Sequence, residues 1–377
     1  MGNTKRIVTV AAAVLAAACE PGAQPLDLDP DPNFAIGSAS SAGPGAVYLT
    51  SNATGGNEIL VFARAADGSI VPNGAVPTGG LGTGIGLGNQ LAMVLTEDNR
   101  QLYAVNAGSD DISAFDVRGG SLEPIGDPVP SGGDQPISLT VHGDLLYVLN
   151  AGIGANVTGF RIAADGSLNA IPQSTQSLSA DGTGAAQIQF TPKGDVLVVT
   201  EKSTNTITTF VVGPDGHAGP PNTQASAGQT PFGFSFDRQG TLIVSEAGTG
   251  TASSYLVGHD GVLTLASGAV PTTQAAPCWV VISENGRNAY TTNTGSGTVS
   301  RFSIGTAASL TLVEAVAGAT GAGSSPQDAD FTPGGRFLYV RNVGGSVSGF
   351  RVTDDGALEH IGNFGPIPTF ASGIVAR

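Results

Sequence analysis

Short runs of alternating apolar and polar residues recur from Ala46 to the C-terminus. In one example, ISLTV at 137–141 is followed by a tight HGD turn and a second run, LLYVLN, at 145–150. A third run, VTGFRIAADG at 157–166, ends in an Asp-Gly turn that leads into SLNAI at 167–171. Alternation with a period of two predicts β-strands, and an Asp-Gly pair between two such runs predicts a hairpin. The pattern therefore predicts units of four antiparallel strands.

Two landmarks show that this unit recurs seven times. An aromatic residue closes the third strand of each unit, at Phe62, Phe115, Phe160, Phe210, Tyr255, Phe302 and Phe350. Asn or Glu closes the strand before it, at Asn52, Asn106, Asn150, Glu201, Glu246, Asn293 and Asn342. Four-stranded units at a spacing of about 47 residues are typical of propeller blades. The predicted fold class is all-β, a seven-bladed β-propeller with four antiparallel strands per blade.

The two ends of the repeat region predict how the ring closes. The first repeat begins with AVYL at 46–49, which matches the second strand of a blade. The chain ends with FASGIVAR at 370–377, which matches a first strand with no blade after it. We therefore expect the C-terminal strand to complete the N-terminal blade, because this leaves no exposed sheet edge in the ring.

The N-terminus has the pattern of an export signal. In residues 1–19, two positive charges precede a short apolar run that is too short to span a bilayer. LAAAC at 15–19 resembles a lipobox and makes Cys19 a candidate lipidation site; the alternative is an ordinary signal peptide cut near Ala18. Residues 20–45 predict a tether, and 46–377 the propeller. We expect an exported protein, held to the cell envelope by lipid or else secreted, that contacts membrane only through the anchor.

Composition excludes several other classes of protein. Charged residues make up 12% of the chain and glycine occurs 56 times, which argues against a helical protein. The formal net charge is −15, and it becomes −17 when Lys5 and Arg6 of the leader are removed. Such a charge disfavours nucleic acid and anionic lipid as partners of the folded part. A protein partner is not predicted either way.

The second cysteine, Cys278, lies in the apolar run PCWVVIS. If Cys19 carries lipid, Cys278 has no partner, so no disulfide is expected. We interpret Cys278 as a buried core thiol. A nucleophilic thiol would need a nearby base, and the sequence supplies no obvious one.

A propeller gathers two sets of loops at one end of its central channel: those that enter the inner strands and those between second and third strands. The entering loops place glutamines at six near-equivalent positions, with Asp134, Asp328 and Asp330 close by; the glutamines are Gln90, Gln135, Gln187, Gln229, Gln274 and Gln327. This channel mouth predicts a pocket for a small polar or anionic ligand. Alternatively, the amides satisfy loop backbone groups that no strand pairs.

Charged residues that depart from the repeat are the candidate catalytic groups. Glu201 and Glu246 replace the ring Asn in adjacent blades, and Lys202 and Arg341 lie beside ring positions. Two neighbouring carboxylates would separate each other's pKa values and provide one base and one acid. Lys202 and Arg341 could bind a carboxylate or a developing oxyanion. The structural alternative is that both glutamates accept the bonds that cap the turn, with Lys202 in solvent.

No metal or cofactor is expected. The chain has no HExxH, no CxxC and no paired histidine ligands. Asn and Glu oxygens would suit calcium, but no EF-hand-type loop occurs. The glycine-rich stretch GLGTGIGLG at 80–88 lacks a following helix and lysine, so it does not predict a phosphate-binding loop.

The repeats resemble the seven-bladed lactonase-like propeller family, which includes 6-phosphogluconolactonases and carboxymuconate-lactonising enzymes. The resemblance is carried by the LYxxN…F…DG pattern and by TPGGRFLYVRN at 332–342 and PCWVVISENGRNAYTTNTGSG at 277–297. It implies metal-independent hydrolysis or formation of a lactone, on an acidic sugar or a muconate-type substrate. The histidine pattern of many members is missing from DQPISLTV at 134–141 and SSPQDADF at 324–331.

Two functions remain open at this point. One is a lactonase or a lactonising cycloisomerase that uses Glu201 or Glu246 as its base. Its substrate would be bound by Lys202, Arg341, Gln135, Gln187, Gln229, Gln274 and Asp328. The other is a non-catalytic surface propeller that binds a small ligand, a glycan or a protein.

Overall fold

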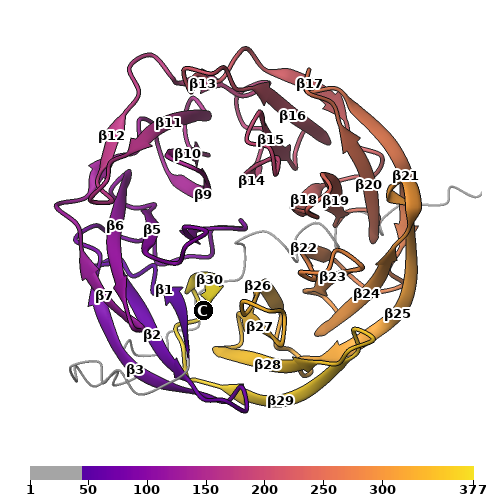
Figure 1. Cartoon of the computed structure of the whole chain (residues 1–377). Coiled ribbons are helices and arrows are strands. Elements are labelled where there is room, and N and C mark those ends of the chain that lie inside the picture. Colours follow the sequence, from indigo (N-terminus) through magenta and orange to yellow (C-terminus); the bar gives the residue numbers. More distant parts are fainter. Residues whose placement is uncertain (1–44) are drawn as a thin grey trace, which may run out of the picture.

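The computed structural model describes residues 45–377, which form seven antiparallel sheets around a central axis (Figure 1). This confirms the predicted seven-bladed β-propeller. Besides strands, the described part contains one short 3₁₀ turn, η1 (Thr306–Ala308). It holds no helix that is long and apolar enough to cross a membrane. The predicted leader with Cys19, and nearly all of the predicted tether, lie outside the described residues.

Each blade runs from an inner strand at the axis to an outer strand at the rim. The inner strands, from blade 1 to blade 7, are β30 (Ser372–Ala376), β4 (Met93–Leu95), β9 (Pro136–His142), β14 (Ala185–Phe190), β18 (Pro231–Phe236), β22 (Pro277–Ile282) and β26 (Pro326–Phe331). The second strands are β1 (Gly45–Thr50), β5 (Gln101–Asn106), β10 (Leu145–Asn150), β15 (Val196–Glu201), β19 (Thr241–Glu246), β23 (Asn288–Asn293) and β27 (Phe337–Asn342).

The third and outer strands complete each sheet. The third strands are β2 (Glu58–Arg64), β6 (Asp111–Arg118), β11 (Asn156–Ile162), β16 (Thr206–Val211), β20 (Thr251–Val257), β24 (Thr298–Ile304) and β28 (Ser346–Val352). The outer strands are β3 (Ile70–Pro77), β7 (Ser121–Pro124), β12 (Leu168–Ala170), β17 (Asn222–Ala225), β21 (Leu263–Pro271), β25 (Leu310–Ala319) and β29 (Leu358–Phe364). Two short strands add a further pairing in blades 2 and 3, β8 (Val129–Pro130) on β6 and β13 (Gln176–Ser177) on β11.

Apolar cores lie between neighbouring blades. In β27, Phe337 and Tyr339 pack into the core shared with blade 1, whereas Leu338 and Val340 pack into the core shared with blade 6. Alternate side chains of a strand point to opposite faces of its sheet, so each blade buries both faces. This explains runs of consecutive apolar residues in second strands, such as FLYV at 337–340.

The C-terminal strand closes the ring, as predicted. β30 pairs antiparallel with β1, with Val47 opposite Ala376 and Tyr48 opposite Val375. β1 begins at Gly45, one residue before the predicted start of the propeller. The last strand of the chain thereby becomes the inner strand of the first blade, and the first strand keeps no unpaired edge toward the channel.

A side-chain hydroxyl crosses every junction between consecutive blades and donates to a carbonyl in the next blade's turn between third and outer strands. In five junctions the donor is a second-strand tyrosine: Tyr48 to Gly120, Tyr103 to Gly166, Tyr147 to Gly216, Tyr290 to Gly356 and Tyr339 to Gly68. Blades 4 and 5 lack this tyrosine. There, Thr209 and Ser254, which lie opposite the replacing residues on the third strand, donate to Gly261 and Ala308.

Candidate functional site

A loop of blade 2 crosses the central channel just before β4 (Figure 1). We call residues 88–91 of this loop the plug. The backbone N–H of Gln90 donates to the carbonyl of Ala186, and its carbonyl accepts from Ser138 Oγ. Its side-chain amide bonds to both the N–H and the carbonyl of Val280 on the far side of the ring. Gln90 alone therefore joins blade 2 to blades 3, 4 and 6.

The residues beside Gln90 extend these connections. The carbonyl of Asn89 accepts from Trp279 Nε1, and its Oδ1 accepts from Ser372 Oγ of the closing strand. The N–H of Leu91 donates to the carboxylate of Asp328 in blade 7. The plug is thus bonded to five other blades. The glycine-rich stretch at 80–88, which did not predict a phosphate-binding loop, leads the chain to the axis.

Lys202 holds the plug from blade 4. Its Nζ donates to the carbonyl of Gly88 at 2.9 Å and lies 4.7 Å from the centre of the Phe232 ring. The side chain is 8% exposed, so it is not the solvated lysine of the structural alternative. Lys202 and Asp328, two of the residues predicted to bind substrate, both form hydrogen bonds with the plug instead.

Arg341 and Asp328 are buried ionisable residues of blade 7 that influence each other's pKa without forming an ion pair among residues 45–377. Arg341 is 3% exposed, and its Nε and Nη1 have no hydrogen-bond partner within this part of the chain. Burial lowers the pKa of Arg341 to about 10, against the opposing effect of Asp328. Burial likewise raises the pKa of Asp328 to about 7, although the N–H groups of Leu91 and Ala329 and the charge of Arg341 lower it.

The six glutamines do not occupy equivalent positions, which corrects the sequence interpretation. In six blades a residue with positive φ lies just before the inner strand; these residues are Leu91, Gln135, Gly184, Thr230, Ala276 and Ser325. The place of the glutamine relative to this residue varies among the blades, between two positions before it and three positions after it. Gln187 is buried and its amide bonds to both backbone groups of Phe234. The others differ in exposure and contacts: Gln135 and Gln274 are half-buried, and Gln229 is exposed.

The two candidate catalytic glutamates are bonded within their own blades. Glu246 is buried and accepts hydrogen bonds from Ser226, Thr251, Ser253 and Tyr255. Glu201 is buried and accepts from Ser179, with longer contacts to Thr204 and Thr206. Among residues 45–377, no hydrogen bond joins the two carboxylates.

The ring asparagines make the same kind of contact as these glutamates. Asn106, Asn293 and Asn342 donate through Nδ2 to Ser113, Ser300 and Ser348 on the third strand, at 2.7–2.8 Å. Glu246 accepts from the equivalent Ser253 at 2.9 Å. A serine hydroxyl can donate or accept, so amide and carboxylate serve one position equally well. This geometry favours the structural interpretation of the Glu and Asn ring.

A cavity of about 480 Å³ opens on the other end of the channel, the end that carries the turns between first and second strands. Its inner end is formed by Gln90 and Leu91 of the plug together with Gln187. Its walls are the C-terminal halves of the inner strands, including Thr140, Gln189, Ser235, Asp330 and Ala376. The pocket therefore lies at the end of the channel opposite to the predicted mouth.

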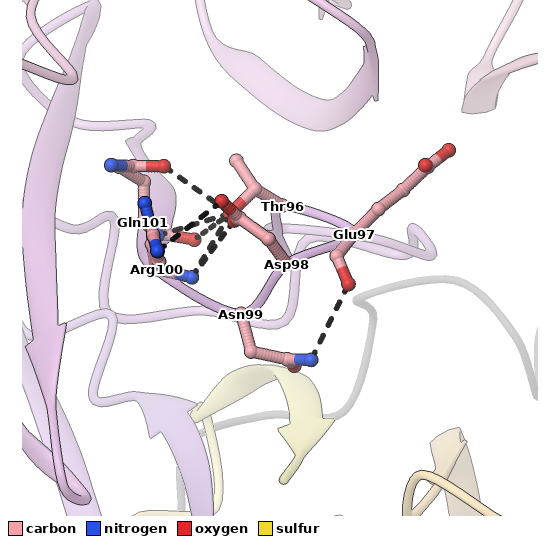
Figure 2. A network of polar contacts seen from close by, with 6 residues as sticks. All are labelled: Thr96, Glu97, Asp98, Asn99, Arg100 and Gln101. Carbon is pink, nitrogen blue, oxygen red and sulfur yellow. Dashed lines mark hydrogen bonds and ion pairs between the residues drawn. The ribbon is translucent and has the colours of Figure 1, made fainter. Parts of the chain in front are cut away.

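The pocket carries three carboxyl groups and no lysine or arginine among its lining residues. Asp330 lies on its wall, and burial raises the pKa of Asp330 to about 7 while the N–H groups of Ala376 and Phe331 oppose this. Glu97 lies in the turn after β4. Figure 2 shows its side chain extending away from the hydrogen bonds that Asp98 and Thr96 make within that turn. Glu284 is the third carboxyl.

Sequence reasoning noted Asp330 but did not choose it as a site residue. The available signal was the inner strand PQDADF, which places two carboxyls where other inner strands carry uncharged side chains. No group of three or more His, Cys, Asp or Glu side chains within residues 45–377 is arranged to hold a metal ion.

The structure contradicts the expectation that Cys278 has no disulfide partner. Cys278 is fully buried beside Phe232 and Trp279, but it is disulfide-bonded. Its partner is not among the described residues, and the chain has one other cysteine, Cys19. A nucleophilic role for Cys278 is therefore excluded in this oxidised state.

Comparison with known proteins places the fold in a family. The profile of the family described as Lactonase, 7-bladed beta-propeller matches residues 153–247 and 242–365, more than half of the chain. The chain belongs to this lactonase propeller family. No curated protein sequence matches it.

Solved structures agree with this family on the fold. The Pseudomonas aeruginosa periplasmic gluconolactonase PpgL superposes with a TM-score of 0.70 at 18% identity, over 88% of this chain and 98% of that one. A candidate 6-phosphogluconolactonase from Bacteroides uniformis gives 0.69 at 19% identity, over 88% and 99%. A Lactobacillus plantarum protein gives 0.72 at 19% identity, over 88% and 99%. At these low identities, the superpositions establish a shared fold.

Proposed function

We propose that this lactonase-family propeller hydrolyses an uncharged sugar lactone in the channel pocket, with Asp330 as the general base. The observation that carries the proposal is a carboxyl group with a pKa of about 7 on the wall of a 480 Å³ cavity at the ring axis. A base whose pKa lies near the working pH is suited to activating water. The volume is typical of small-molecule sites.

The reaction needs one proton acceptor that later returns the proton. The Asp330 carboxylate takes a proton from water as the water oxygen attacks the lactone carbonyl carbon. The bond from that carbon to the ring oxygen then breaks, and Asp330 returns the proton to the leaving alkoxide. Thr140 and Gln189 line the same pocket and offer O–H and N–H donors to the carbonyl oxygen.

The charge of the pocket bears on the class of substrate. Asp330 and Glu97 would repel a phosphorylated or carboxylated ring, because no lysine or arginine lines the pocket. The third carboxyl, Glu284, is paired with Arg238 at 2.7 Å and adds less repulsion. This argues for a neutral lactone in place of the acidic substrate expected from the sequence. The structural neighbour PpgL is a periplasmic gluconolactonase, which supports an unphosphorylated sugar lactone.

Export is part of the same proposal. The leader at 1–19 has the pattern of a secretory signal, and a disulfide at Cys278 fits an oxidising compartment. We place the enzyme outside the cytoplasm, either secreted with the disulfide at Cys278 or, where Cys19 carries lipid in place of a disulfide, held to the envelope.

The proposal is tested by following hydrolysis of glucono-δ-lactone and of its 6-phosphate with purified protein. We expect faster turnover of the unphosphorylated lactone, a pH–rate profile with an apparent pKa near 7, and a loss of about 100-fold or more in Asp330→Asn. Glu97→Gln removes a charge from the same pocket and should change kcat by less than about threefold. Binding of the lactone without turnover would contradict catalysis and favour the non-catalytic alternative. Full activity of Asp330→Asn would contradict the assigned base.

A further inference from the structure

A second cavity adjoins the channel pocket and has the opposite charge. It is a groove of about 640 Å³ between blades 6 and 7, on the end of the ring that carries the channel pocket. Glu284 lines both cavities, so they share a wall. The groove is lined by Arg238, Arg336 and Arg351, and we call it the arginine groove.

These arginines are a notable concentration of positive charge. Only 13 lysines and arginines follow the leader, against 30 acidic residues, and three of the 13 line this groove. Apart from Glu284, the groove has one other acidic lining residue, Asp354. In a chain with this net charge, an anion is attracted to few places, and the groove is one of them.

Two of the three guanidinium groups keep free bonding capacity. Arg351 meets Glu359 at a long 3.6 Å, and its Nε is buried without a hydrogen-bond partner among residues 45–377. Arg336 stacks on the ring of Phe337 at 5.2 Å and forms no ion pair among the described residues. Arg238 is committed to Glu284 at 2.7 Å. Arg336 and Arg351 can therefore accept a new anionic partner without breaking a short ion pair.

Uncharged donors and acceptors fill the rest of the lining. Ser283, Asn285, Asn288 and Thr353 supply hydroxyl and amide groups that suit the hydroxyls of a sugar. The volume exceeds what a bare inorganic anion occupies and lies within the usual range for small-molecule sites. The groove chemistry therefore matches a polyhydroxylated carboxylate.

Hydrolysis of a lactone creates such a ligand. The neutral ring becomes a hydroxy acid, which ionises and gains a negative charge inside a pocket lined by three carboxyls. We propose that the arginine groove binds this sugar-acid anion next to the pocket where it is formed, an inference that rests on the proposed function. Repulsion in the pocket and attraction in the groove then move the product in one direction, across the wall that contains Glu284.

Equilibrium binding of sodium gluconate, measured by calorimetry with glucose as the uncharged control, tests the groove without requiring turnover. We expect gluconate to bind, glucose to give no comparable signal, and the double variant Arg336→Gln/Arg351→Gln to weaken gluconate binding about tenfold or more. Arg351→Lys should retain part of the affinity, because it keeps the charge and loses the fork geometry. Arg118→Gln is the matched control: Arg118 is exposed and ion-paired to Asp116 and Glu123 in blade 2, so binding should not change.

Failure of this inference can be separated from failure of the proposed function. Asp330→Asn should abolish hydrolysis but leave gluconate binding intact. Lactone hydrolysis in wild-type protein together with no gluconate binding, or with equal affinity in the double variant, would overturn the groove assignment alone. Equal weakening by Arg118→Gln would show a general charge effect and would also overturn it. Arginine-dependent gluconate binding without any hydrolysis would support the anion site and refute its role in product release.

Discussion

The phenolic oxygen of Tyr339 lies 2.6 Å from the carbonyl oxygen of Gly68, a residue 271 positions earlier in the chain. This bond crosses the seam where the last blade meets the first, and a tyrosine makes the equivalent bond at four of the six other junctions, while a threonine and a serine make it at the remaining two. The seam is therefore closed by the pairing of β30 with β1 and also by the contact that all other neighbouring blades use.

Removing this hydroxyl should destabilise the ring. We expect Tyr339→Phe to lower the free energy of unfolding by about 1–2 kcal/mol, because the buried Gly68 carbonyl loses its partner. Tyr103→Phe removes the equivalent bond to Gly166 at an internal junction and should cost about the same. Urea denaturation measures both. A much smaller loss for Tyr339→Phe would show that the seam carries less of the stability than an internal junction.

The plug passes very close to the inner strand of blade 5, and this closeness can be tested at Gly233. A Cβ on Gly233 would lie 2.3 Å from Gln90 Oε1 and 2.7 Å from the carbonyl of Cys278. Gly233→Ala should therefore cost about 1–3 kcal/mol of unfolding free energy. Gly55→Ala, where a Cβ would meet nothing within 4 Å, should change it by less than about 0.5 kcal/mol.

The same variant has a spectroscopic readout. Trp279 is the only tryptophan of the chain, and its Nε1 donates to the plug residue Asn89. Displacement of the plug in Gly233→Ala should shift the fluorescence emission of Trp279. An unchanged emission spectrum, with wild-type stability, would contradict the described path of the plug.

The buried glutamates provide a test between structural and catalytic roles. We expect Glu246→Gln to cost about 1 kcal/mol, since the surrounding hydroxyls can reverse their hydrogen bonds toward an amide as they do at Asn293. Glu246→Ala should cost more, because Thr251 and Ser253 lose their shared acceptor. Lactone hydrolysis by both variants should stay within about twofold of wild type once folding is confirmed by circular dichroism. A loss of activity without a loss of stability in Glu246→Gln would restore the catalytic interpretation.

The raised pKa values of the two inner-strand aspartates determine how the stability of the fold should depend on pH. Asp328 and Asp330 have pKa values of about 7 in the folded protein, against 3.8 for an ordinary aspartate. Between about pH 4 and 7 the folded state therefore binds more protons than the unfolded state, so the free energy of unfolding should fall as pH rises through this window. Above the folded pKa the effect should level off.

Thermal denaturation at pH 5, 6, 7 and 8 measures this trend. Asp328→Asn and Asp330→Asn mimic the protonated form and should each flatten it, whereas Asp127→Asn, at an exposed position, should not. Asp67, in one of the Asp-Gly turns, has a pKa lowered by hydrogen bonds from Ser69, so its carboxylate is protonated, and its contribution to stability lost, only at lower pH. A melting temperature that rises from pH 5 to pH 7 in wild type would contradict the raised pKa values.

The disulfide at Cys278 competes with the predicted lipid anchor for the other cysteine. A sulfur atom cannot carry a diacylglycerol thioether and a disulfide at the same time, and Cys19 is the only second cysteine. We expect mature protein exported under oxidising conditions to show a two-proton mass deficit that reductant reverses. Protein that carries a lipid mass at Cys19 and a free thiol at Cys278 would contradict the disulfide.

The overall fold could be predicted from the sequence because each blade repeats the same local rules. The ring residues such as Asn106 and Asn293, and the Asp-Gly turns, recur at fixed places in each unit. Closure was also readable, since the two chain ends carried complementary parts of one blade. The prediction that Glu201 and Glu246 occupy the same blade position as the asparagines was correct. Their hydrogen bonds match the interpretation in which both glutamates have a structural role.

The candidate site could not be predicted to the same extent, because it depends on contacts between distant blades. Spacing made the glutamines look equivalent, but they stand on different sides of the one-residue bulge with which the inner strands begin. Gln135 comes before Pro136, the partner of Asn150, whereas Gln187 lies beyond the bulge, opposite Thr200. Nothing in the run around Gln90 indicates that it crosses the ring to Val280. Asp330 was visible as a charge in an inner strand, but its raised pKa follows from burial by neighbouring blades.

The bonds made by the plug also bear on the order in which the protein can be completed during synthesis. Asn89 is made early, yet it is bonded to Ser372, which lies 283 residues later in the chain. Gln90 likewise waits for Val280, 190 residues downstream. Such distant contacts are slow to form because a long loop must close first. The plug therefore cannot make all of its hydrogen bonds until Ser372 has been synthesised, and a chain cut short before β30 would lack the full set permanently.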